Sequence, residues 1–61
     1  MYRWLVGLTG DETGRTLWFH EFAGDFKSAV DKAWPELHRE LKDYDNPETF
    51  SATNVIRVCE V

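Results

Sequence analysis

The sequence predicts an α+β fold in which two strands, one helix and a last strand (ββαβ) build a three-stranded antiparallel sheet in the order 2-1-3. Apolar side chains alternate over residues 2–8, as in a strand, whereas over residues 26–43 they recur at helical spacing. The 61 residues allow one small domain, 1–61. With 43% hydrophobic and 15% aromatic residues, the composition is that of a folded chain.

The first two predicted strands form a hairpin. Residues 2–8 turn one apolar set of side chains to the same face: Tyr2, Trp4, Val6 and Leu8. The segment 9–14, TGDETG, holds the glycines and polar residues of a turn. It leads into a second strand over residues 15–23, which is apolar on both faces. Alternation places two pairs of large side chains on opposite faces, Leu17 with Phe19 and Trp18 with Phe22.

A helix is predicted over about 26–43, with Asp25 placed to cap its first free N–H groups. One stripe of this helix is apolar and holds Phe26, Ala29, Val30, Ala33, Trp34, Leu37, Leu41 and Tyr44. Pro35 lies inside the segment, where a proline disfavours helix, but it projects from the opposite face and the stripe keeps its phase. We therefore expect one kinked helix, with two short helices as the alternative.

The last predicted strand is NVIRVCEV, residues 54–61, after a loop over 43–53 in which Asn46-Pro47 signals a turn. The helix returns the chain so that this strand runs parallel to the second. Placing it beside the first strand gives the antiparallel order 2-1-3, with residues 2–8 in the centre.

A single helix leaves one face of this sheet uncovered, and the sequence predicts that this face is apolar. Periodicity leaves open which way the second and third strands face. The uncovered set is Leu5 with Leu17 and Phe19 or with Trp18 and Phe22, and with Val55 and Val61 or with Ile56 and Val58. Contiguous exposed apolar patches of this kind mark interfaces. The alternative is a twisted sheet over which the loop 45–53 folds with Phe50.

The composition points away from several functional classes. A net charge of −4 and a pI of about 4.9 argue against a protein that binds nucleic-acid phosphates. The two histidines and the single Cys59 lack metal-ligand spacing, and the glycines form no phosphate loop. We therefore expect no enzyme activity and no cofactor. One cysteine, no apolar N-terminal segment and no membrane-spanning run suggest a cytoplasmic location.

Acidic residues crowd the end of the predicted helix and the loop after it: Glu36, Glu40, Asp43, Asp45 and Glu48. Anions at a helix C-terminus oppose the helix dipole, so helix stability does not account for them. One interpretation is a solvated helix end. The other is an acidic patch that docks into a basic groove, such as that of an enzyme acting on nucleic acid, and steers association.

The hairpin, the helical segment FAGDFKSAVDKAW and the terminal strand VIRVCEV together resemble small phage-encoded host-takeover proteins such as the RNA-polymerase inhibitors of T7-like phages. The resemblance covers most of the chain and is one of element order and size. It implies a protein that grips its target through arginines of the last strand, near an acidic strip. Arg57 matches one such arginine, and Val55 stands where a second is expected.

The sequence thus favours a non-catalytic protein that binds and modulates, and by the resemblance inhibits, a larger host protein. The candidate binding residues are Trp18 or Phe19, whichever is exposed, with Arg57, Glu36, Glu40 and Asp43. One alternative is a structural homodimer that packs through the uncovered sheet face. Another is a single-strand nucleic-acid module in which aromatic side chains of the second strand stack on bases, which the acidic charge opposes.

Overall fold

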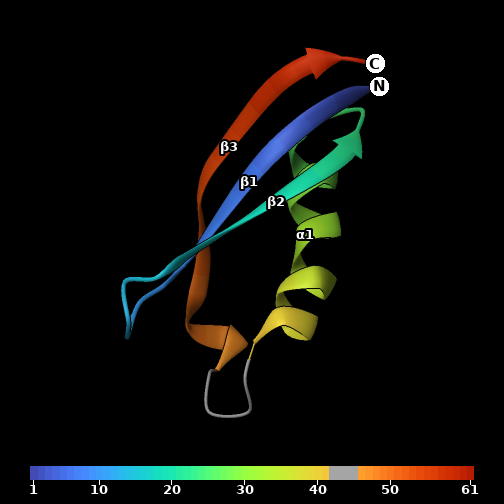
Figure 1. Cartoon of the computed structure of the whole chain (residues 1–61). Helices are drawn as coiled ribbons and strands as arrows, with labels where there is room; N and C mark the ends of the chain where they lie inside the picture. Colours follow the sequence, from blue (N-terminus) through green and yellow to red (C-terminus); the bar gives the residue numbers. More distant parts are fainter. Residues whose placement is uncertain (42–45) are drawn as a thin grey trace.

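The computed structural model describes residues 1–41 and 46–61 and confirms the α+β fold (Figure 1). The elements are β1 (Tyr2–Gly10), β2 (Thr16–Ala23), α1 (Phe26–Glu40), a 3-10 turn η1 (Pro47–Thr49) and β3 (Phe50–Glu60). The strands form one antiparallel sheet in the order β2-β1-β3, as predicted. Helix α1 lies against one face of this sheet, mainly along β2 and β1.

Some element ends differ from the prediction. Strand β3 begins at Phe50 rather than at residue 54, because the side chain of Asn46 caps η1 and the chain then enters the sheet directly, with Phe50 opposite Gly10. Helix α1 ends at Glu40 rather than near 43. Leu41 leaves the helical path with an extended backbone, and its side chain packs against the core. The predicted stripe residue Tyr44 lies outside the described residues.

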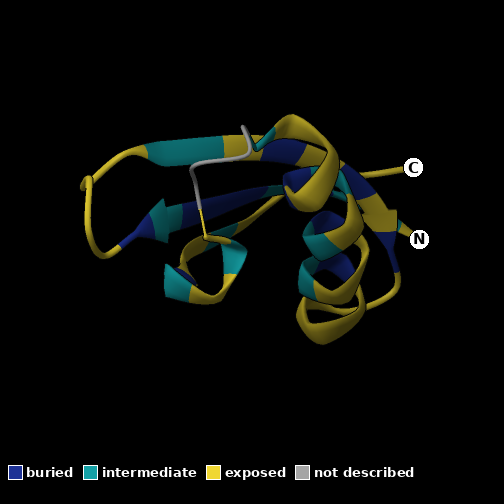
Figure 2. Cartoon of the chain, turned by 90° about the horizontal axis from the view of Figure 1, so that it is seen from below, coloured by how far each residue is buried: buried dark blue, intermediate teal, exposed yellow. Residues whose placement is uncertain are grey.

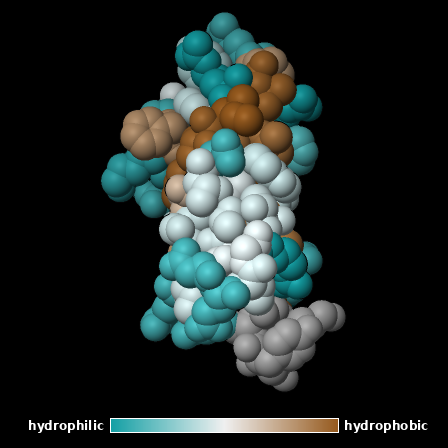
Figure 3. Space-filling view, turned by 90° about the vertical axis from the view of Figure 1, so that its left-hand side faces the viewer, coloured by the Kyte–Doolittle hydropathy of each residue, from teal (hydrophilic) through white to brown (hydrophobic). Residues whose placement is uncertain are grey.

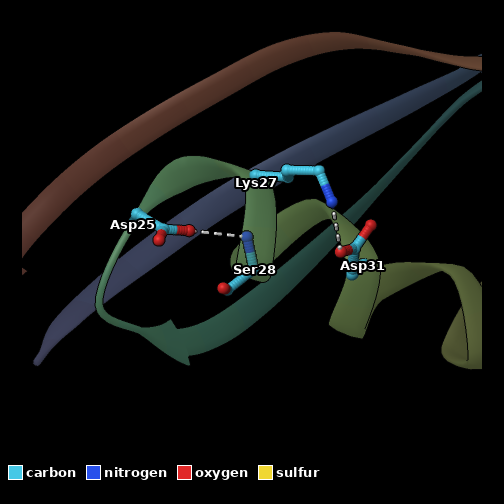
Figure 4. A network of polar contacts seen from close by, with 4 residues as sticks. All are labelled: Asp25, Lys27, Ser28 and Asp31. Atoms are coloured by element: carbon cyan, nitrogen blue, oxygen red, sulfur yellow. Dashed lines mark hydrogen bonds and ion pairs between the residues drawn. The ribbon is translucent and has the colours of Figure 1, made fainter.

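The start of α1 is fixed as the sequence predicts. Asp25 has extended dihedral angles, and its carboxylate accepts a hydrogen bond of 2.8 Å from the backbone N–H of Ser28 (Figure 4). This hydrogen bond holds the pKa of Asp25 below its usual value. Lys27 and Asp31 form an ion pair of 3.4 Å one turn further on. A single helix passes through Pro35, so the alternative of two short helices is wrong.

The core lies between α1 and the sheet. Its most deeply buried side chains are Val6 and Leu8 of β1 and Ala29, Ala33 and Leu37 of α1. In Figure 2 the buried positions of α1 face the strands and the exposed ones point away. The two alanines leave room for the helix to approach the sheet closely. Phe26 was predicted on the buried stripe but is exposed, because the buried stripe begins one turn later at Ala29.

The structure decides the facing of the strands that periodicity left open. Phe19 and Ala23 of β2 are buried on the helix side, whereas Trp18 and Phe22 are exposed on the other side. On β3, Val55 is partly buried against the core and Ile56 is exposed. Strand β3 is otherwise exposed apart from Phe50, because α1 lies mainly over β2 and β1.

Two glycines of β1 each receive an aromatic ring from a neighbouring strand. A Cβ on Gly7 would lie 2.8 Å from the indole of Trp18, and a Cβ on Gly10 would lie 2.9 Å from the ring of Phe50. The first contact is on the open side of the sheet and the second is in the core. Since Phe50 packs in the core, it does not fold over the open face as the alternative proposed. Both strand pairings therefore depend on the missing side chain of a glycine.

Gly10→Ala is expected to lower the free energy of unfolding by about 1–3 kcal/mol, because the added methyl group overpacks the buried ring of Phe50. Gly7→Ala should be milder, since the half-exposed indole of Trp18 can tilt into solvent. Gly24→Ala is the matched control, because no atom lies within 4 Å of its Cβ position. Denaturant unfolding of the three variants measures the order. Equal stability of the Gly10 and Gly24 variants would contradict this packing.

Candidate interaction surface

The side of the sheet opposite α1, called here the outer face, is an ordered grid of side chains. Each outward residue of β1 lies between one residue of β2 and one of β3. From the end near the chain termini, the rows are Phe22–Arg3–Cys59, His20–Leu5–Ile56, Trp18–Gly7–Asn54 and Thr16–Thr9–Ser51. Strand β3 carries irregularities of register around Val58 and Thr53, which lie between these rows.

The rows near the termini hold an apolar cluster. Its members are Leu5, Trp18, Phe22 and Ile56. The exposed fractions are 47% for Trp18, 51% for Phe22 and 47% for Ile56, large values for side chains of this size. Figure 3 views the molecule from the side away from α1 and shows hydrophobic residues gathered in its upper half. The cluster includes residues of all three strands, with His20 between Trp18 and Phe22 on β2.

The opposite end of the outer face is polar. The hydroxyl oxygen of Thr9 lies 2.7 Å from that of Thr16 and 2.8 Å from that of Thr53, so hydrogen bonds join all three strands there. Thr53 also donates to the carbonyl oxygen of Gly7 over 3.4 Å. These hydroxyl groups bond to one another, and they bound the apolar cluster on one side.

The structure separates the candidate binding residues from each other. Trp18 is the exposed member of its pair and belongs to the apolar cluster, whereas Phe19 is 8% exposed and belongs to the core beside Val6. Of the pair Trp18 and Phe19, Trp18 is therefore the one that lies on the surface. Arg57 lies on the helix side of β3, with its guanidinium 4.8 Å from the ring centre of Tyr2. Arg57 follows Ile56 of the apolar cluster in the chain, but its side chain lies on the other face of the sheet, in a cation–π contact with Tyr2.

The acidic residues at the helix end are only partly exposed. Glu40 and Glu48 are exposed, but Glu36 is half-buried and lies beside Glu21 of β2. Asp43 and Asp45 lie outside the described residues. Of the three predicted acidic binding residues, Glu40 alone is exposed within the part of the chain that the structure describes.

A buried carboxyl group, which the sequence reading missed, lies between β2 and α1. Glu21 is 7% exposed and faces the helix side of the sheet between Phe19 and Ala23. The pKa of Glu21 is raised to about 7. Burial is the largest cause, and Glu36 adds to it through hydrogen bonding and charge repulsion, while Lys32 and Arg39 act in the opposite direction. The signal in the sequence was the phase of β2, because the register that buries Phe19 also buries Glu21.

The pKa of Glu21 makes stability depend on pH. Between pH 4.5 and about 7 the folded chain holds a proton on Glu21 that the unfolded chain releases. The free energy of unfolding should therefore fall as pH rises through this window. Glu21→Gln should remove most of this fall and raise stability above the window by about 1–3 kcal/mol, since one pKa unit corresponds to about 1.4 kcal/mol.

Denaturant unfolding across this pH range tests the expectation. Glu12→Gln, at an exposed position of the hairpin turn, is the control and should keep the pH dependence of the native chain. If the Glu21→Gln and native chains lose stability in parallel as pH rises, Glu21 is not the group responsible.

Residues 1–41 and 46–61 enclose no pocket, and no group of three histidine, cysteine or acidic side chains within them could hold a metal ion. Their helices include none that is long and apolar enough to cross a membrane. Comparison of the chain with protein-family models, curated proteins and solved structures finds no significant match.

Proposed function

We propose that this chain is a non-catalytic binding protein that docks on a larger protein through the apolar cluster and modulates it. The observation that carries the proposal is the exposure of Trp18 and Phe22 on the outer face, with Ile56 exposed on the other side of β1. Full burial of a large apolar side chain is worth about 1.5–3 kcal/mol. In a domain of 61 residues, leaving several of them in water is a large fraction of the stability that such a chain can reach.

The composition of the cluster supports docking. Trp and Phe are enriched at the centres of protein interfaces, where truncation of one ring has a large effect on affinity. Hydrogen-bonded hydroxyl groups lie beside the cluster on the outer face, as polar groups do at an interface rim. In the role that the resemblance implies, the partner is a host-cell protein in the cytoplasm and docking inhibits it.

The test compares three variants as baits for a bacterial lysate. Phe22→Ala and Ile56→Ala truncate the apolar cluster, and each is expected to weaken binding by about 2 kcal/mol or more, roughly thirtyfold, mainly through faster dissociation. Phe26→Ala is the matched control, because it removes an exposed phenylalanine from α1, away from the cluster. The stoichiometric partner of the native chain should be retained by the control and lost by the two cluster variants.

Salt separates this mode of binding from docking by the acidic helix end. Exposed charges are screened over about 8 Å at physiological ionic strength, so an acidic docking surface would lose its partner as salt is raised. The apolar cluster should hold its partner. The proposal would be contradicted if high salt released the partner while the Phe22→Ala variant still bound it. Failure to recover any stoichiometric partner would also contradict it.

A further inference from the structure

We propose that the partner surface presents a carboxylate group to Arg3, within the apolar contact, and that it belongs to a protein other than a second copy of this chain. This inference rests on the proposed function. It is carried by the charges of the outer face rather than by the exposure of its apolar side chains.

The outer face carries no acidic side chain. The chain has 11 acidic and seven basic residues, and yet the outward positions of β1, β2 and β3, all of which are described, include neither Asp nor Glu. The charged or titratable nitrogen groups there are those of Arg3 and His20. Glu21 and Glu60 occupy helix-side positions of the strands. The outer face is therefore apolar with a basic group, on an acidic protein.

Arg3 is the basic group at the edge of the apolar cluster. It lies in the row between Phe22 and Cys59, is partly buried, and its Nε atom is buried with no hydrogen-bond partner among the described residues. Other cations have contacts within the chain: Arg57 lies over Tyr2, Lys27 pairs with Asp31, and Lys32 donates to the carbonyl oxygen of Phe22. The Nε–H group of Arg3 can therefore be paired by an acceptor on another molecule.

Docking through the apolar cluster would remove further water from Arg3. A guanidinium group covered by apolar surface alone is strongly unfavourable, because a buried charge without a partner loses its hydration. A carboxylate satisfies it with two parallel hydrogen bonds in a planar geometry that an arginine is suited to form. The occupant that fits the outer face is thus an apolar surface with an Asp or Glu side chain opposite Arg3.

A second copy lacks this group. A two-fold dimer through the outer face would place the same patch on both sides of the interface. Each Arg3 would then meet apolar, hydroxyl, amide, thiol, Arg and His side chains but no carboxylate. The same feature that selects an acidic partner therefore disfavours self-association.

A random peptide library displayed on phage is the probe. Peptides are selected for binding to the native chain, and those that also bind the Phe22→Ala variant are removed. The peptides that remain need the apolar cluster. We expect the remaining peptides to combine apolar residues with Asp or Glu. Arg3→Glu should weaken the binding of these peptides about tenfold or more and should itself select peptides rich in Lys and Arg.

Arg57→Glu is the matched control, because it reverses a cation on the helix side of the sheet and should keep the preference for acidic peptides. Arg3→Gln removes the charge without reversing it, and it serves as the second variant if Arg3→Glu loses the circular-dichroism spectrum of the folded chain. Arg3→Gln should abolish the preference for acidic peptides. Peptides that need Phe22 but show no acidic preference would overturn the role of Arg3 and leave the docking surface standing.

Selected peptides that bind Phe22→Ala as well as the native chain would instead overturn the proposed function together with this inference. Sedimentation equilibrium completes the test. The native chain should remain a monomer up to millimolar concentration, and Arg3→Leu should associate more strongly than Arg57→Leu. A native dimer that Phe22→Ala dissociates would show that a second copy occupies the outer face, against the inference.

Discussion

Helix α1 can cover only one of the two faces of the sheet. This constraint determines where the core forms and which side chains stay exposed. Helix α1 brings its small residues, Ala29 and Ala33, onto the side of the sheet that carries Val6 and Leu8, and nearly all complete burial in the domain occurs there. On the other side, the indole of Trp18 lies over Gly7. The remaining apolar side chains of that side are therefore available to another protein.

The charged side chains are also distributed unequally between the two faces of the sheet. Acidic residues of the described chain lie in the hairpin turn, at the N-cap of α1 and on α1, in η1 and on the helix side of the strands. One of them, Glu21, is buried with a raised pKa close to Glu36. The outer face keeps Arg3 without a carboxylate. A site that combines apolar contact with one unpaired cation is selective, because apolar contact supplies affinity and the cation penalises partners without an anion.

The sequence was sufficient for the element order, the single helix and the order of strands, because alternation in 2–8, the helical stripe and the helix cap at Asp25 are local signals. It could not decide the face of β2, since both phases of that strand carry large apolar residues. The correct phase buries Glu21, which hydrophobic patterning alone disfavours. The start of β3 was missed because the pairing of Phe50 with Gly10 is a long-range contact.

The most direct test of the open outer face is the effect of a neutral, soluble gadolinium chelate on the NMR signals of the free chain. The account predicts strong relaxation of the methyl groups of Ile56 and of the indole N–H of Trp18, and protection of the methyl groups of Leu8 and Leu37. This pattern should not change as the protein concentration is raised. Protection of Ile56 and Trp18 in the dilute chain, or its appearance on concentration, would contradict the claim that the chain leaves this face open for a different protein.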